Sequence, residues 1–153
     1  MEQKKIKYKD GVYSANIDIT MSEWKEMLTN PDIFTENSLN VIGYWYSQAD
    51  YMATSKEIME KFNIERKRTP FNGIVISLGK RIINYLNRFK VIGTDGNKAY
   101  FVIPFEGWYE NYDVNKNFVW KIRAELIQAI EELHLFNDVA ERVDDDYENI
   151  GII

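Results

Sequence analysis

The chain has 153 residues, 45% of them hydrophobic and 28% charged, with a formal net charge of −5 at pH 7; these values fit one globular domain and exclude a disordered chain. It has no cysteine, which excludes disulfides and thiolate metal sites, and no apolar run approaches the roughly 18 residues that a membrane helix needs. The charged start, MEQKKIKYKD, is not typical of a signal peptide, so we expect a cytoplasmic protein.

The amino-terminal part of the chain alternates apolar and polar residues around a turn. Residues 6–19 alternate about Asp10-Gly11, a dipeptide typical of hairpin turns, and predict two short strands or one strand with an irregular start. Ser22 is a candidate cap for a short helix over 23–29, which Asn30-Pro31 ends.

Two further helices are predicted before the middle of the chain. Thr35 is expected to open the first, over about 36–48. Its expected inward residues are Leu39, Ile42 and Trp45 or Tyr46. Thr54 and Glu57 have the spacing of a capping box, which predicts a second helix that continues to about Asn63.

The segment 69–86, TPFNGIVISLGKRIINYL, has the clearest helical pattern. Thr69 can cap a helix and Pro70 suits its first position. Apolar residues recur at steps of three and four: Phe71, Val75, Leu78, Ile82 and Tyr85 or Leu86. The opposite face and its flanks carry Asn72, Gly73, Ile76, Ser77, Lys80, Arg81 and Asn84. Periodicity alone favours a core helix with a solvated face, but a helix that lies in a DNA groove fits the same pattern.

The surroundings of this helix favour DNA binding. The two helices, 54–63 and 69–86, and the basic turn between them have the spacing of a helix-turn-helix. Two extended runs, 90–94 and 97–104, then flank Asp95-Gly96 and predict a β-hairpin in the position of a wing. We therefore expect an α+β, winged helix-turn-helix-like domain.

The carboxyl-terminal part is expected to close the core. A loop over 105–113 precedes a predicted long helix, 118–134, whose inward residues are Val119, Ile122, Leu126, Ile130 and Leu133. We expect residues 1–136 to form the single domain and 137–153 to form an acidic, loosely ordered tail.

Charge is unevenly distributed along the chain. Between Lys56 and Lys90, nine lysines and arginines and three glutamates give a balance of +6, so the remainder carries −11. Salt screens charges over about 8–10 Å, so a local basic surface can attract phosphate even on an acidic protein.

Few residues point to catalysis, and we expect neither an enzyme nor a metal or cofactor site. The single histidine, His134, better fits a structural place near a helix end. Two Glu-x-Lys triplets, at 23–25 and 65–67, lack the strands that a nuclease centre requires, and the run 144–146 is more typical of solvated aspartates. No spaced glycines form a phosphate loop.

Aromatic residues gather in the second half of the chain. Trp108, Tyr109 and Tyr112 form a candidate aromatic pocket, since aromatic faces can stack a base or hold an alkylated group. Packing against the last helix is an equal alternative for these three. Packing is the better interpretation for the remaining ones, Phe105, Phe118 and Trp120.

Four segments carry a resemblance to a known family: EWKEMLTNPDIF at 23–34, SLGKRI at 77–82, IPFEGW at 103–108 and FVWKIRAEL at 118–126. They resemble the amino-terminal module that precedes HNH nucleases or AAA+ motors in McrA- and McrB-like modification-dependent restriction systems, over about residues 12–135. The resemblance implies a module that reads DNA, including modified DNA, for a separate nuclease or AAA+ partner in a defence system. The chain departs from this pattern in its acidity and in having no nuclease or ATPase of its own.

We therefore predict a non-catalytic module that binds double-stranded DNA. The residues expected to face the groove are Asn72, Ile76, Ser77, Lys80, Arg81 and Asn84, with Ile76 against a pyrimidine methyl group. Those expected to contact phosphates are Arg66, Lys67, Arg68, Arg88 and Lys98. The net charge of −5 favours an alternative, an acidic protein-binding module such as a phage or mobile-element inhibitor of a nucleic-acid-binding defence protein.

Overall fold

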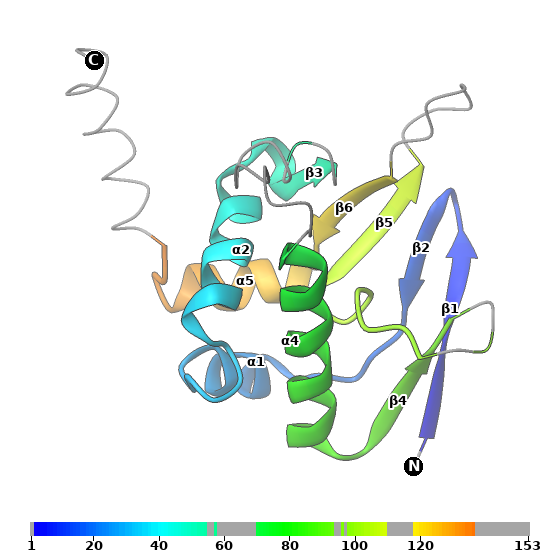
Figure 1. The fold of residues 1–153 in the computed structure, drawn as a ribbon, viewed down its shortest axis with the longest axis horizontal. Coiled ribbons are helices and arrows are strands. Elements are labelled where there is room, and N and C mark those ends of the chain that lie inside the picture. The colour runs from blue at the N-terminus through cyan, green and yellow to red at the C-terminus, as the bar shows by residue number, and fades with distance from the viewer. Residues whose placement is uncertain are drawn as a thin grey trace.

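The computed structural model describes residues 2–54, 57, 70–93, 96, 98–109 and 118–136. These residues form an α+β fold built on a mixed six-stranded sheet of order β3-β6-β5-β2-β1-β4 (Figure 1). The strands are β1 (Glu2–Lys9), β2 (Val12–Ala15), β3 (Met52–Thr54), β4 (Phe89–Ile92), β5 (Phe105–Tyr109) and β6 (Phe118–Ile122). The helices are α1 (Met21–Leu28), α2 (Glu36–Ser47), α4 (Pro70–Leu86) and α5 (Ala124–Glu132), with a 3-10 turn at Ala49–Tyr51.

The predicted amino-terminal hairpin is confirmed. β1 and β2 pair in antiparallel register, with Lys7 opposite Ser14. Asp10 and Gly11 both have positive φ, 53° and 83°, as a tight two-residue hairpin turn requires. On its other side β1 pairs in parallel with β4, so the hairpin links β4 to the rest of the sheet.

The first helix begins two residues earlier than predicted, at Met21, and its cap is Thr20, not Ser22. The Thr20 hydroxyl accepts from the Glu23 N–H at 3.1 Å, and the Glu23 carboxylate accepts from the Thr20 N–H at 3.0 Å. This capping box satisfies two N–H groups, whereas Ser22 lies inside the helix. The second cap, Thr35, is confirmed and opens α2.

α2 buries the face that the sequence predicted. Ile42 and Trp45 are fully buried, and Leu39 and Tyr46 are half-buried against the core. The Trp45 indole N–H donates to the backbone oxygen of Trp120 at 2.9 Å, which ties α2 to β6.

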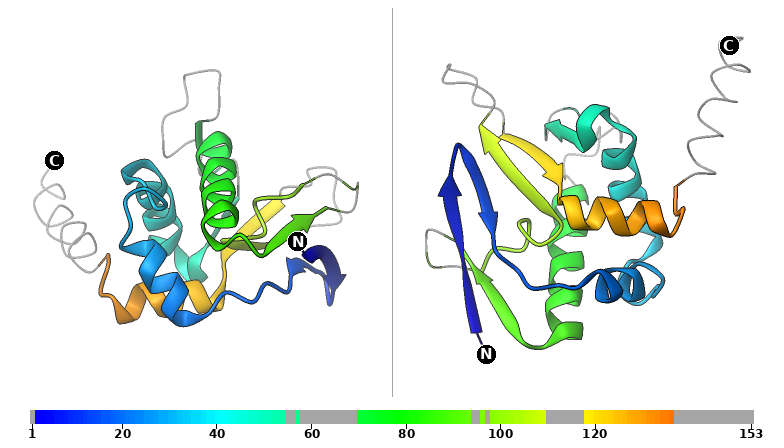
Figure 2. Two further views of the ribbon diagram at one scale, coloured as in Figure 1. Left: turned by 90° about the horizontal axis from the view of Figure 1, so that it is seen from below. Right: turned by 180° about the vertical axis from the view of Figure 1, so that it is seen from behind.

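α4 is also confirmed, and Val75, Leu78 and Ile82 are each at most 1% exposed. Tyr85 is not part of this buried stripe, since it is 40% exposed and its hydroxyl donates to Glu26. α4 lies at the front in Figure 1, whereas α5 lies at the front in the view from behind (Figure 2, right).

The capping box predicted at Thr54 and Glu57 forms. The Thr54 N–H donates to the Glu57 carboxylate at 3.0 Å, and the Glu57 N–H donates to the Thr54 hydroxyl at 3.1 Å. The rest of the predicted helix to Asn63 and the basic turn after it lie outside the described residues.

The second strand of the predicted wing does not form over the described residues 98–104. Lys98 makes one isolated bridge to Ile92, and residues 101–104 form a turn. Successive residues of a strand point to opposite faces, so a strand here would separate the side chains of Val102 and Ile103, but both are buried, at 2% and 0% exposure. A turn directs both side chains into the core, which a strand at the surface cannot do.

The predicted loop was wrong over residues 105–109, and the predicted helix 118–134 was wrong in its amino-terminal part; residues 110–113 lie outside the described residues. Residues 105–109 and 118–122 form the antiparallel pair β5–β6, and α5 begins only at Ala124. Val119 and Ile122 fit a helical stripe by spacing, but pairing with β5 and β3 fixes them in a strand.

One charged side chain is held inside the core. Arg123 is 5% exposed, and its guanidinium donates to the backbone oxygens of Val102 and Ala15 at 2.5 and 2.6 Å. Burial lowers the pKa of Arg123, which the nearby Glu125 carboxylate partly offsets. These bonds fix the 101–104 turn against the end of β2. No helix in the part of the chain that the structure describes is long and apolar enough to span a bilayer.

Candidate nucleic-acid interface

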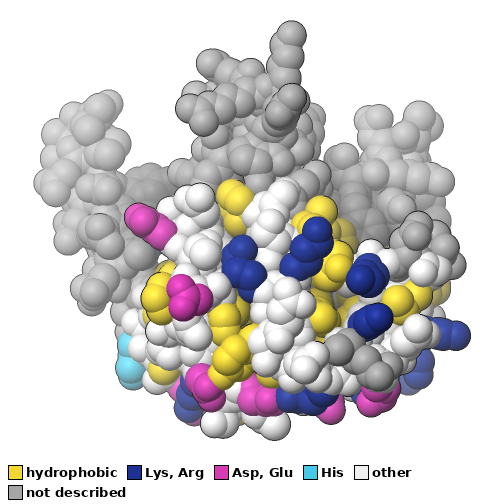
Figure 3. Space-filling model, turned by 60° about the horizontal axis from the view of Figure 1, so that its bottom comes forward, with side chains coloured by type: hydrophobic (Ala, Val, Ile, Leu, Met, Phe, Trp, Pro, Cys, Tyr) yellow, Lys and Arg dark blue, Asp and Glu magenta, His cyan; other side chains and the backbone are white. Residues whose placement is uncertain are grey.

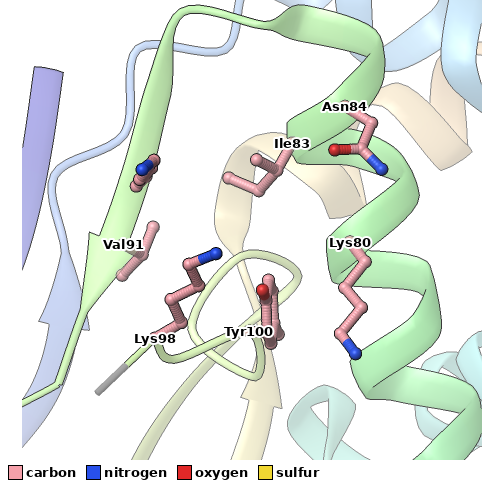
Figure 4. A pocket seen from close by; sticks show the side chains of 7 residues that line it. Lys80, Ile83, Asn84, Val91, Lys98 and Tyr100 are labelled. Carbon is pink, nitrogen blue, oxygen red and sulfur yellow. The ribbon is translucent and has the colours of Figure 1, made fainter. Parts of the chain in front are cut away.

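A hollow of about 350 Å³ lies between α4, β4 and the segment 98–100 (Figure 4). We call it the lysine cleft. Its lining residues are Lys80, Ile83, Asn84, Lys90, Val91, Lys98 and Tyr100.

Each segment contributes to the cleft for a local reason. On α4, steps of three and four residues bring Lys80, Ile83 and Asn84 to the same side of the helix. On β4, Lys90 alternates with the buried residues Phe89 and Val91, so its side chain leaves the core.

Gly79 sets the distance between α4 and the third segment. A Cβ atom at this position would lie 2.7 Å from the Cβ of Tyr100 and 2.9 Å from its backbone oxygen. Only glycine therefore permits this approach, which brings the Tyr100 ring beside Lys80. The Lys80 Nζ lies 5.5 Å from the centre of that ring, within the range of a cation–π interaction.

The described lining residues make the cleft electropositive, because three of them are lysines and none is a carboxylate. Lys80 and Lys98 are exposed and Lys90 is half-exposed. Within the described ranges, none of the three forms an ion pair. The asparagine amide and the tyrosine hydroxyl add neutral hydrogen-bonding groups.

The described lining residues are suited to binding anions. Ammonium groups attract phosphate or carboxylate oxygens, and no carboxylate or imidazole stands among these lining residues. No group of three or more histidine, aspartate or glutamate side chains in the described part of the chain could hold a metal ion.

The structure brings together part of the predicted DNA-contacting set. Lys80, Asn84 and Lys98 border the cleft, and Ser77 is exposed on the same helix, with Ile76 half-buried. In Figure 3 lysine and arginine side chains gather across the middle of this face, and acidic side chains lie mainly along its lower and left margins.

Two predicted contact residues have intramolecular partners. The Arg81 Nε donates to the backbone oxygen of Ile33 at 2.7 Å, and burial lowers the pKa of Arg81. Arg88 pairs with Glu23 at 2.5 Å and with Asp18 at 3.4 Å, so its charge is compensated within the protein.

The remaining predicted site residues lie wholly or in their side chains outside the described part of the chain. The side chains of Asn72, Trp108 and Tyr109, and the whole of Arg66, Lys67, Arg68 and Tyr112, lie outside the described residues. The backbone of residues 108 and 109 belongs to β5.

Two polar lining residues, Lys90 and Tyr100, were not among the predicted contacts. Lys90 had a detectable signal, because it opens the predicted run 90–94 between the apolar residues Phe89 and Val91, where alternation points it outward. Tyr100 had none, since its place depends on the close approach at Gly79.

No family model, curated protein or solved structure matches this chain. The similarity of its four segments to the DNA-reading modules of restriction systems stays a prediction.

Proposed function

We propose that this chain is a non-catalytic module that binds double-stranded DNA through the lysine cleft and the exposed face of α4. The observation that carries the proposal is the convergence of Lys80, Lys90 and Lys98, from three separate segments, around one hollow whose described lining residues include no carboxylate. Such a surface meets the phosphate backbone, which supplies most of the affinity of DNA-binding proteins.

In this proposal α4 is the recognition helix. Ser77, Lys80 and Asn84 follow one another along its exposed side. From Ser77 to Asn84 the helix rises about 10 Å, and the major groove, about 12 Å wide, admits a helix of this kind. Hydroxyl and amide groups can read base edges there, while the lysines fix the position of the helix on the backbone.

The finer arrangement is part of the same proposal. α4 would form a helix-turn-helix with the helix predicted from Thr54, whose capping box is present. By the resemblance to restriction-system modules, the bound DNA would carry a modified base, and a separate nuclease or AAA+ motor would act on it.

Salt-dependent binding tests the proposal directly. We expect fluorescence anisotropy with a labelled duplex to show affinity that falls with salt, with a slope of about −0.9 in log–log form for each phosphate contact. Lys80→Gln, Lys90→Gln and Lys98→Gln should each make this slope shallower by about 0.9. Lys25→Gln is the matched control, because Lys25 pairs with Glu132 at 2.8 Å and is not a lining residue of the cleft.

Two results would overturn the proposal: wild-type protein that does not bind duplex DNA, or cleft variants that bind as the wild type does. The net charge of −5 favours a second candidate, an acidic module that binds a nucleic-acid-binding protein. If that candidate is right, the wild type does not bind duplex DNA, and Lys80→Glu and Lys98→Glu do not change its affinity for the protein target.

A further inference from the structure

The β1–β2 hairpin carries a row of lysines that lies outside the cleft. Lys5, Lys7 and Lys9 occupy alternate positions of β1, and all three are exposed. Alternate residues of a strand point to the same face, so the three ammonium groups form one row. The opposite face of β1 carries the half-buried Ile6, which packs against the core.

The strand register joins this row to the lysine cleft. In the parallel pairing of β1 with β4, Gln3 lies opposite Lys90 and Lys5 lies opposite Ile92. Paired residues share a face of the sheet, so Lys90, which borders the cleft, stands on the same face as the row. Basic side chains continue to the right margin of Figure 3, the side on which Figure 1 places β1.

No described residue compensates the charges of the row. No ion pair or hydrogen bond joins the side chains of Lys5, Lys7 or Lys9 to another described residue, whereas Lys4, on the other face, pairs with Glu2 at 2.8 Å. Their cross-strand partners on β2 are uncharged: Lys7 faces Ser14 and Lys9 faces Val12. The nearest acidic residue along the chain is Asp10, in the turn.

We propose that this row binds the phosphate backbone of the duplex that occupies the cleft, so that the amino-terminal hairpin takes the part expected of a wing. This inference rests on the proposed function. The row from Lys5 to Lys9 spans about 13 Å, which is the rise of roughly four base pairs. The duplex therefore runs from α4 across β4 and along β1, and the row adds affinity without reading sequence.

The experiment compares two variants of equal charge. The row variant combines Lys5→Gln, Lys7→Gln and Lys9→Gln, and the control combines Lys4→Gln, Lys25→Gln and Lys121→Gln, which lie on the other face of β1, on α1 and on β6. Each is titrated with a duplex of about 30 base pairs, long enough to cover both surfaces. Circular dichroism and thermal midpoints establish that both variants are folded.

We expect the plot of log affinity against log salt to become shallower by about 2.7 in the row variant and to stay unchanged in the control. Between 50 and 200 mM salt, wild-type affinity should then fall about 40-fold more than that of the row variant. The control should keep the wild-type slope.

The outcomes separate this inference from the proposed function. A row variant with the wild-type slope, together with weakened cleft variants, would overturn the inference alone. If the row variant binds duplex DNA more weakly and the cleft variants bind it as the wild type does, the proposed role of the cleft is overturned instead. Wild-type protein that ignores duplex DNA would overturn both, and row-dependent binding to anionic lipid vesicles would then identify a membrane surface as the ligand.

Discussion

Glu23 connects two distant parts of the molecule through one carboxylate. It accepts the Thr20 N–H as part of the α1 capping box, and it pairs with Arg88, which directly precedes β4. The hydrogen bonds from Arg88, followed by those from Thr20, outweigh burial and lower the pKa of Glu23 to about 2. The same pairing raises the pKa of Arg88 and removes this arginine from the surface available to phosphate.

The first prediction concerns the pH dependence of stability. Because the pKa of Glu23 is lower in the folded protein than the ordinary value of 4.5, its contribution to stability is complete above pH 4.5 and disappears as the pH falls toward 2. Both partners are partly exposed, so we discount the contribution to about 1 kcal/mol. Urea unfolding should show Glu23→Gln less stable by that amount at pH 7 and equal to the wild type near pH 2.

Asp32→Asn is the control, since this exposed carboxylate forms no ion pair with another described residue. A constant difference between Glu23→Gln and the wild type across this pH range would contradict the assignment, because it would trace the loss to the cap geometry and not to the charge.

At the scale of the elements, the contact of α4 with the segment 98–104 shapes the cleft. The second prediction is that Gly79→Ala destabilises the protein by about 1–3 kcal/mol, because the added methyl group would overlap both the side chain and the backbone of Tyr100. Displacement of Tyr100 should also weaken duplex binding. Thermal unfolding and anisotropy measure the two effects.

Gly73→Ala is the matched control on the same helix. A Cβ at Gly73 meets no atom within 4 Å, so the higher helix propensity of alanine should stabilise the protein by up to about 1 kcal/mol. If both substitutions stabilise, the close approach of α4 to Tyr100 is not a feature of the folded protein.

Local signals account for the elements that the sequence predicted. α2 and α4 have caps or a proline at their starts and buried residues at helical spacing, and the hairpin has Asp10-Gly11 at its turn. β5 and β6 lack such signals. Val119 and Ile122 suit a helix as well as a strand, and only pairing with chain segments far away in the sequence decides between them.

The same distinction applies to the candidate site. Lys80 and Asn84 were predicted because a helix face follows from period alone. The role of Lys90 depends on the parallel pairing of β4 with β1, and Arg81 bonds a backbone oxygen 48 residues away in the chain. Both contacts depend on segments far apart in the sequence, so sequence reasoning identified the helix and Lys98 but not Lys90 or the internal partner of Arg81.

At the scale of the whole molecule, the net negative charge of the protein repels DNA, whereas its basic face attracts DNA. The net charge is −5, yet the lysine cleft and the β1 row carry positive charge that no described residue pairs with. Salt decides whether a DNA phosphate is affected by the net negative charge or only by the positive charge of the basic face. The screening length is about 8 Å at physiological ionic strength and about 30 Å at 0.01 M.

The third prediction follows from comparing these lengths with the size of the molecule. A chain of this length has a radius of gyration of about 15 Å, so near 0.01 M salt the whole charge acts on the DNA, and at physiological salt only the nearest face does. The plot of log affinity against log salt should therefore flatten below about 0.03 M instead of remaining linear. Replacing Asp144, Asp145 and Asp146 with asparagine, which changes the net charge from −5 to −2, should restore affinity there and leave it unchanged at physiological salt. An equal gain at every salt concentration would show that these aspartates act by local repulsion at the DNA and not through the field of the whole molecule.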